Sequence, residues 1–567
     1  MRPLLRKRSM LILLVLCATG IVGWTFFRPQ AAPVHALDQL TPEGALLYIE
    51  ARDFSGLLKD WNASPERAEW LKSDDYRVFS NSRLFLRLGE ASDQFAAAAG
   101  LPPNMKFLLE AAGRESAVAV YEIGKLEFLY VTRLSSGDFV QSTLWQSRSK
   151  FQSRNAGGKP FFVRKDEESG RVVAFAVADN YLILGTREDL VAGSLELMSG
   201  SKGRALNGEG WYKQARAAAS PTPGDLRMVM NLQNLAVTPH FRTYWIQQNI
   251  TEMRGYAGAV SDLYREGQVY REERVILPVS GDKEPGSSAP AVTALLSSVP
   301  SDFGFYQAGP VDAKRALAVL EQKILAPRFG VARTERLAPQ VQLSSGQAGA
   351  GTDLETRIDV EPASRVTSQN AAEALQRQLE KASPQALLVI QASHKNADGV
   401  LLSLPAVVAI AASNDWDVVS TQNAIQEMIA PGLTAARLGL QWRELKDAGG
   451  YYELDGLFPL QMAVRGKVMY LANDAGLLAS VLQTRNQSLS QPATYAAGFS
   501  HARERQKFYE FTSLVDQSSA TRGAEPQFFS QNMASFSRAL AKLESEEIIT
   551  RQTKDKIQQT VTYRWMQ

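Results

Sequence analysis

The four histidines are the residues best suited to metal binding or proton transfer, and their spacing favours neither. His35, His240, His394 and His501 lie far apart, and no two have the short separation with which a helix or a turn builds a metal site. The one cysteine, Cys17, lies in a hydrophobic segment, so the rest of the chain has no thiolate ligand and no disulfide. We expect surface or capping roles for the histidines, and no metal or other cofactor.

A serine and a lysine come nearest to a pattern for nucleophilic catalysis. Ser147 and Lys150 have the S-x-x-K spacing of penicillin-recognising enzymes, and Ser368–Asn370 or Ser530–Asn532 could imitate the second motif of those enzymes. No K-T-G triad follows, and two fixed positions recur by chance in 567 residues. The G-x-S-x-G elbow of hydrolases is also missing. We therefore interpret Ser147 to Lys150 as a solvated helix face and assign no catalytic residue.

Glycines and acidic residues give no stronger signal. Residues Gly346–Gly351 are rich in glycine but lack the Gly-Lys-Ser/Thr ending of a phosphate-binding loop, which favours an ordinary loop. Adjacent carboxylates in a strand or helix point apart, so neighbouring acids do not form a catalytic pair. Four such pairs are expected on the surface: Asp74-Asp75, Glu167-Glu168, Glu272-Glu273 and Glu546-Glu547.

Composition describes an ordinary folded protein with more than one domain. Apolar residues make up 45% of the chain and charged residues 21%, which suits a packed core, and 567 residues exceed the size of one domain. The net charge is +3, from 62 basic and 59 acidic residues, so no field favours nucleic acid as a partner. Most tryptophans are expected in the core rather than as platforms for sugars.

One hydrophobic segment predicts a membrane anchor. Met10–Phe27 contains no charged residue and, as a helix, is just long enough to span the hydrocarbon core. Arg2, Arg6, Lys7 and Arg8 precede it, and basic residues stay on the cytoplasmic side. The sequence therefore predicts a single-pass protein of the cytoplasmic membrane, with its N-terminus inside and its bulk outside, in the periplasm. Signal-peptide cleavage after Val34-His35-Ala36 is an open alternative, and lipid modification of Cys17 is a weaker one.

The rest of the chain divides into two similar parts. Residues 28–39, with two prolines, predict a short tether, and the Pro-, Gly- and Ser-rich residues 277–292 predict a linker between a first unit, 40–276, and a second unit, 293–567. Leu40–Tyr48 matches Val299–Tyr306, with proline and tyrosine at the same spacing. This indicates an internal duplication.

A second match strengthens that interpretation. Val177–Leu184 aligns without gaps to Val464–Leu471, and each segment predicts two strands around a tight turn. Two leucine pairs of the following helices then coincide, Leu190 with Leu477 and Leu195 with Leu482. Further expected elements are the helices 54–61, 311–325, 239–253 and 528–543, the paired strands within 117–134 and 386–410, and the closing strands 268–277 and 560–566.

This pattern predicts an α+β fold, with a transmembrane helix followed by two related units of mainly antiparallel sheet packed with helices. The anchor, the Pro42 to Tyr48 opening, the doubled body and the Pro300 to Tyr306 opening resemble a bacterial family of envelope-anchored proteins known only as a domain of unknown function. The resemblance covers roughly Asp38 to the C-terminus. It implies an extracytoplasmic location and the duplicated α+β fold, and it transfers no catalytic residue.

Three functions are compatible with the sequence. The first is a non-enzymatic interaction or scaffold module of the cell envelope that binds the membrane through Met10–Phe27 and has an envelope protein as partner. The second is a binder of an apolar ligand or lipid, because the apolar face of the helix Phe529–Leu543 could cover a groove. The third is a hydrolase acting on envelope polymers, with Ser147 and Lys150 as its only named residues. An enzyme is therefore disfavoured, and the sequence does not indicate an oligomeric state.

Overall fold

The computed structural model describes most of the chain after residue 33. The described residues are 34–134, 139, 142–200, 203–238, 254–279, 288–325, 369–392, 405–433, 440–445, 450–455, 460–485, 491–505 and 541–566. Several predicted features lie outside them: the anchor Met10–Phe27, His240, His394, the glycine-rich residues 346–351, the helix 239–253 and nearly all of the helix 528–543.

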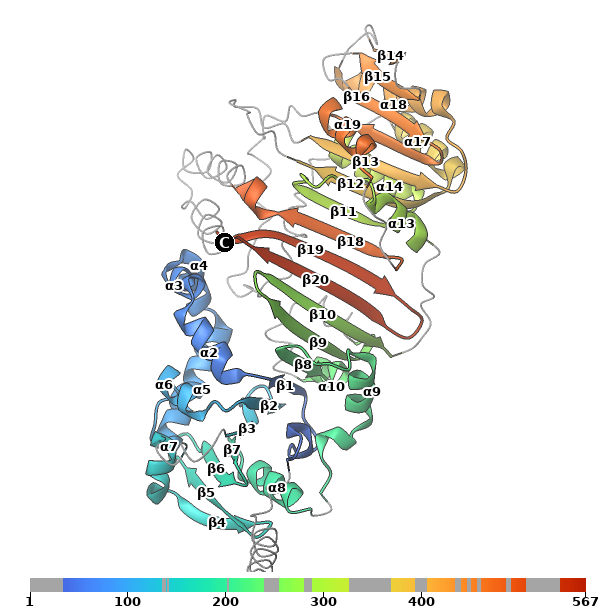
Figure 1. The fold of residues 1–567 in the computed structure, drawn as a ribbon. Coiled ribbons are helices and arrows are strands. Elements are labelled where there is room, and N and C mark those ends of the chain that lie inside the picture. The colour runs from blue at the N-terminus through green and yellow to red at the C-terminus, as the bar shows by residue number, and fades with distance from the viewer. Residues whose placement is uncertain are drawn as a thin grey trace, which may run out of the picture.

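One antiparallel sheet of twenty strands runs through the described residues (Figure 1). The strands of the first half are β1 (Leu47–Ala51), β2 (Glu115–Glu122), β3 (Glu127–Arg133), β4 (Gln152–Ala156), β5 (Lys159–Lys165), β6 (Val172–Ala178), β7 (Tyr181–Gly185), β8 (Leu226–Met230), β9 (Tyr256–Glu266) and β10 (Val269–Pro278). Their order across the sheet is β4, β5, β6, β7, β3, β2, β1, β8, β9, β10.

The second half repeats this order. Its strands are β11 (Phe305–Pro310), β12 (Pro384–Gln391), β13 (Ala406–Ala412), β14 (Gln441–Glu444), β15 (Tyr451–Asp455), β16 (Leu460–Arg465), β17 (Val468–Ala472), β18 (Tyr495–Ser500), β19 (Leu543–Gln552) and β20 (Ile557–Trp565). Across the sheet they run β14, β15, β16, β17, β13, β12, β11, β18, β19, β20. Each strand of the second half therefore has the same neighbours as the strand numbered ten lower.

The two halves meet where β10 pairs with β20. Val269 lies opposite Arg564 and Ile276 lies opposite Ile557 in an unbroken antiparallel register. We call β9, β10, β20 and β19 the bridge, and the strands and helices on its two sides the first lobe (β1–β8) and the second lobe (β11–β18). In Figure 1 the bridge lies between the two lobes, and the molecule is elongated along the direction in which the strands succeed one another.

Helices cover both faces of the sheet in each lobe. Those of the first half are η1 (Leu37–Gln39), α2 (Phe54–Ala63), α3 (Pro65–Lys72), α4 (Asp74–Ser80), α5 (Arg83–Ala99), α6 (Met105–Ala111), α7 (Thr143–Gln146), η3 (Ser147–Lys150), α8 (Glu188–Met198), η4 (Leu206–Gly208), α9 (Gly210–Ala218) and α10 (Leu232–Val237). Those of the second half are α13 (Ala289–Leu296), α14 (Ala313–Leu320), the π-helical turn η5 (Glu321–Leu325), α17 (Gln369–Ala382), α18 (Val418–Leu433) and α19 (Ala475–Gln483).

The strands build two cores in each lobe because successive side chains point to opposite faces. In β7, Ile183 joins the core under α8 and α9, whereas Leu182 and Leu184 join the core under α5, α6 and α7. The same alternation occurs in β12. Leu388 joins the core under α13 and α19, whereas Leu387 joins the core under α14, α17 and α18 on the other face. The predicted α+β class with a mainly antiparallel sheet is confirmed for the described residues.

Candidate functional site

The structure gives Ser147 and Lys150 no catalytic arrangement. They form the short helix η3, in which Ser147 is buried and Lys150 is exposed. The Ser147 hydroxyl donates a hydrogen bond to the backbone oxygen of Leu144 at 2.8 Å, so it acts as a local cap. Arg148 lies over the ring of Trp145, with 4.8 Å between the guanidinium carbon and the ring centroid.

The two described histidines are held by separate contacts. The backbone of His35 binds Tyr181, and His501 packs edge-on against Phe499 with 4.7 Å between ring centroids. The Nε2 atom of His501 lies 3.9 Å from Glu546. Within the described ranges, no three His, Cys, Asp or Glu side chains gather into a group that could hold a metal ion.

Neighbouring acids on a strand do point apart, as the sequence predicted. On β10, Glu272 accepts hydrogen bonds from Arg274 at 2.7 Å and from Ser261 at 2.6 Å. Glu273 instead pairs with Arg271, which also stacks over the ring of Tyr264 on the opposite face of the sheet. The two carboxylates therefore belong to different surfaces.

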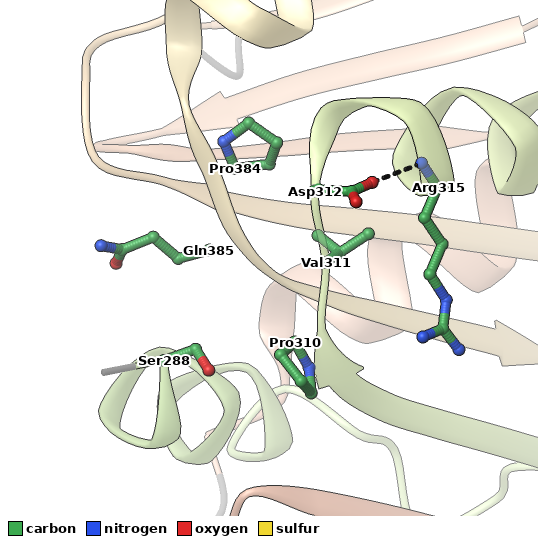
Figure 2. A pocket seen from close by; sticks show the side chains of 7 residues that line it. All are labelled: Ser288, Pro310, Val311, Asp312, Arg315, Pro384 and Gln385. Atoms are coloured by element: carbon green, nitrogen blue, oxygen red, sulfur yellow. Dashed lines mark hydrogen bonds between the residues drawn. The ribbon is translucent and has the colours of Figure 1, made fainter. Parts of the chain in front are cut away.

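A shallow pocket of about 370 Å³ lies at one side of the second lobe (Figure 2). It is lined by the beginning of α13, the end of β11, the start of α14 and the start of β12, through Ser288, Pro310, Val311, Asp312, Arg315, Pro384 and Gln385. Its one carboxylate, on Asp312, caps α14 by accepting a hydrogen bond from the backbone nitrogen of Arg315 at 2.7 Å. The pocket is wide open to solvent, so it does not give the enclosure that a catalytic site or an apolar-ligand site needs.

The helices α2 to α5 of the first lobe form a helical arm. Its first two helices, α2 and α3, contain no buried residue, so burial in the core does not account for them. The sequence dictates its shape, because each helix begins at a side chain that caps it. Asp53, Ser64 and Ser82 accept hydrogen bonds from backbone nitrogens of α2, α3 and α5 at 3.0, 3.2 and 3.2 Å. The arm ends where Gly100 adopts φ +70°, a conformation that favours glycine.

The arm has a small aromatic cluster of its own. Trp70 packs against Tyr76 and Phe79, with ring centroids 6.2 and 6.3 Å apart. Phe85 completes the cluster by contacting Phe79 at 5.4 Å and Tyr76 at 6.0 Å. Edge-to-face contacts of this kind hold helices together, but neither α2 nor α3 contains a buried residue.

Large apolar side chains of the arm face solvent. Trp61 is 50% exposed, and Leu86 and Leu88 of α5 are 60% and 44% exposed. Leu71 of α3 adds a fourth, at 39%. These four side chains lie on α2, α3 and α5. Single exposed leucines are common, but several large exposed apolar side chains on one arm mark it as a candidate contact surface.

Ion pairs connect the arm to the bridge. Asp60 of α2 pairs with Arg265 of β9 at 3.0 Å, and Glu66 of α3 lies 4.0 Å from Lys542, which precedes β19. At the base, Arg87 of α5 donates to the backbone oxygen of Gly124 at 3.3 Å. Figure 1 shows α2, α3 and α4 as a column that rises from the first lobe alongside the bridge.

The neighbouring bridge strands carry charged and aromatic side chains, several of which contact one another. Burial alone would raise the pKa of Glu272, but hydrogen bonds from Arg274 and Ser261 together outweigh it and lower the pKa. Tyr270 and Trp565 pack together across the β10–β20 junction, with ring centroids 5.9 Å apart. This surface is largely polar, so the arm is the better candidate for contact with an apolar partner.

Comparisons with known proteins assign no family. The sequence matches no family model and no curated protein. Among solved structures, "Structure of crystal form I of TP0453" is 13% identical, covering 47% of this chain and 85% of that chain at a TM-score of 0.24. The structure titled crystal form IV of TP0453 is 9% identical and covers 43% of this chain and 81% of that chain at a TM-score of 0.24. The structure titled crystal form III of TP0453 is 10% identical and covers 48% of this chain and 88% of that chain at a TM-score of 0.23.

In the part of the chain that the structure describes, no helix is both long and apolar enough to cross a membrane. The predicted anchor, Met10–Phe27, is not among those residues.

Proposed function

We propose that the protein is a membrane-tethered extracytoplasmic scaffold that holds a protein partner on the helical arm α2–α5. The observation that carries this proposal is the exposure of Trp61, Leu71, Leu86 and Leu88 on an arm that caps and ion pairs connect to the rest of the molecule. A partner that covered these side chains would remove apolar surface from water.

The continuous sheet supports the scaffold part of the proposal. Backbone hydrogen bonds run from β4 through the β10–β20 junction to β14, so the two lobes are joined by pairing strands as well as by the chain that connects them. A scaffold needs such a fixed relation between its parts, because a flexible linker would let the bound surfaces move apart.

We infer that the two halves are related units that arose by duplication. Their matching strand orders support this, and so does the junction itself. When the first half is aligned with the second by a shift of 288 positions, Val269 corresponds to Ile557 and Ile276 corresponds to Arg564. The observed pairs are Val269 with Arg564 and Ile276 with Ile557, so exchanging the two halves turns each pair into the other. The junction therefore has the two-fold character of a homodimer interface.

The periplasmic location is also a proposal, and it rests on the sequence. The uncharged segment Met10–Phe27 and the basic residues before it favour export of everything that follows.

A photo-crosslinking amino acid at Leu86 tests the arm in intact membranes. Position 86 should give one discrete adduct with another protein, because the partner covers it. Val419 on α18, which is 67% exposed in the second lobe, provides a matched apolar control. Equal labelling at 86 and 419, or an adduct only with lipid at 86, would contradict a protein partner on the arm.

A further inference from the structure

The residues that follow the predicted membrane anchor are fastened to the first lobe by a set of contacts around Tyr181. The Tyr181 hydroxyl accepts a hydrogen bond from the backbone nitrogen of His35 at 2.9 Å and donates one to the backbone oxygen of His35 at 2.8 Å. The Tyr181 ring is 2% exposed, so the hydroxyl is presented by a side chain that the core holds in place.

Two buried leucines also hold this segment on the first lobe. Leu37 and Leu40 are 7% and 0% exposed and belong to the core under α8 and α9. The Thr41 hydroxyl donates to the backbone oxygen of Leu37 at 2.8 Å, and the backbone oxygen of Thr41 accepts from Leu206 at 2.8 Å. Burying two leucine side chains removes their apolar surface from water and stabilises the docked segment.

A charged contact lies between these two attachments. Asp38 accepts hydrogen bonds from Arg216 of α9 at 2.9 Å and from the hydroxyl of Tyr212 at 3.2 Å. Arg216 also lies 3.5 Å from Glu50 of β1, so α9, β1 and η1 share one guanidinium group. The Asp38 side chain is 13% exposed, which protects the pair from screening by salt.

The attachment ends at Pro42, whose backbone oxygen accepts a hydrogen bond from the hydroxyl of Tyr121 at 2.7 Å. We call residues 35–42 the clasp. The last five residues of the predicted tether, 35–39, are therefore docked on the lobe, and only residues 28–34 separate the clasp from the predicted anchor.

We propose that the clasp makes the first lobe the membrane-proximal part of the molecule, so that the face around Tyr181 and α8 lies next to the lipid surface. This inference rests on the proposed anchor, Met10–Phe27. Seven connecting residues span about 25 Å at full extension, because each residue adds at most about 3.6 Å. The clasp cannot move farther than that from the end of the anchor.

The length of the sheet places the second lobe differently. Thirteen strand steps separate β7 from its counterpart β17 in the observed order. At about 4.8 Å for each step they amount to roughly 60 Å along the sheet, somewhat less after twisting. The second lobe has Val468 where the first has Tyr181 in the aligned hairpins, so it lacks the hydroxyl that holds His35.

Energy transfer to a lipid headgroup dye tests this arrangement with the full chain in vesicles. A donor dye is placed on Glu196→Cys in α8 or on Gln483→Cys in α19, each in a Cys17→Ser background. These two exposed positions correspond to each other in the alignment of the two halves, which makes them matched probes. We expect transfer from position 196 to exceed transfer from position 483 at least several-fold.

A variant of the clasp distinguishes the contact between the clasp and the first lobe from membrane binding through the anchor alone. Tyr181→Phe combined with Leu37→Ala, Asp38→Ala and Leu40→Ala keeps the Tyr181 ring in the core but removes the contacts to His35 and Arg216 and the apolar contacts of the two leucines. Transfer from position 196 should then decrease while the protein remains on the vesicles, because the longer free segment lets the lobe move away.

The outcomes also distinguish the inference from the proposed function. Failure of the full chain to float with vesicles would overturn the anchor itself. Vesicle binding with equal transfer from 196 and 483, or with more transfer from 483, would overturn only the membrane-proximal first lobe. A mature chain that begins at Leu37 would overturn both, because His35 and the anchor would be missing.

Discussion

Arg227 of β8 and Asp262 of β9 form a two-point ion pair across neighbouring strands, at the place where the first lobe joins the bridge. The guanidinium donates to both carboxylate oxygens, at 2.7 and 2.8 Å, and both side chains are 2% exposed. The backbone nitrogen of Gly224 also donates to Asp262 at 3.1 Å, and the backbone oxygen of Ser220 accepts a hydrogen bond from Arg227 at 2.6 Å. The corresponding pair of the second half is Ala496 opposite Ile549, which shows that an apolar pair can fill the same place in this sheet.

Arg227→Ala should therefore destabilise the protein strongly. It leaves the Asp262 carboxylate buried without its partner, which typically costs about 3–5 kcal/mol. Chemical denaturation of the detergent-solubilised protein measures the loss. The double variant Arg227→Met with Asp262→Leu should recover much of it, since it replaces the ion pair by apolar side chains.

The exposed pair Arg443–Asp455 of the second lobe is the control for that experiment, with side chains 61% and 57% exposed. Arg443→Ala should cost no more than about 1 kcal/mol, because solvent screens the pair. Equal losses for Arg227→Ala and Arg443→Ala would show that the buried pair does not fasten the lobe to the bridge.

Val561→Asp should uncouple the two halves. Val561 lies on β20 opposite Glu272 of β10 and is 1% exposed, so the substitution buries a carboxylate next to another one. We expect one thermal transition for the natural protein and two for Val561→Asp, together with new proteolytic cleavage in the bridge of the variant. Thr562→Ala, on the other face of the same strand, should leave one transition. A single, lower transition for Val561→Asp would instead indicate that the halves unfold together without this junction.

Stability should respond to pH through Glu50. Burial raises the pKa of Glu50 above its ordinary value of 4.5, and Arg216 offsets this only in part. The folded state therefore binds the proton more tightly than the unfolded state, and this contribution is complete below the unfolded pKa and lost as pH rises through the folded pKa. Glu50→Gln should gain stability relative to the natural protein over that upward pH range, measured by denaturation at a series of pH values.

Glu272→Gln should behave in the opposite way. The pKa of Glu272 is lowered, so its contribution is present above the unfolded pKa and disappears as pH falls through the folded pKa. The variant should lose stability near neutral pH and approach the natural protein in acid. Parallel pH curves for the two variants would contradict these assignments.

Local patterns predicted many elements, because turn chemistry acts over a few residues. The hairpin expected at 177–184 is β6 and β7, and its turn residues Asp179 and Asn180 have φ of +47° and +67°, as a tight hairpin requires. The paired strands expected within 117–134 are β2 and β3. The expected helix 54–61 is α2, which continues to Ala63.

Long-range features could not be derived in the same way. The β10–β20 pairing joins residues nearly three hundred positions apart, and alternation along a strand does not identify its partner. The helical arm beyond α2 was also missed, although the caps at Ser64 and Ser82 and the proline at position 65 are start signals that the sequence contains. The clasp depends on a tyrosine hydroxyl that binds backbone atoms, and such a contact leaves no pattern in the sequence.

The location of the C-terminus relative to the membrane decides most directly whether the protein is a periplasmic scaffold. A phosphatase that becomes active only after export is fused behind Gln567, with a matched fusion that lacks residues 1–27. If the bulk of the chain is exported, the phosphatase is active in the membrane fraction for the full chain and inactive for the truncated chain. An inactive phosphatase on the full chain, together with activity of a cytosolic reporter at the same position, would contradict the periplasmic scaffold and the membrane-proximal first lobe.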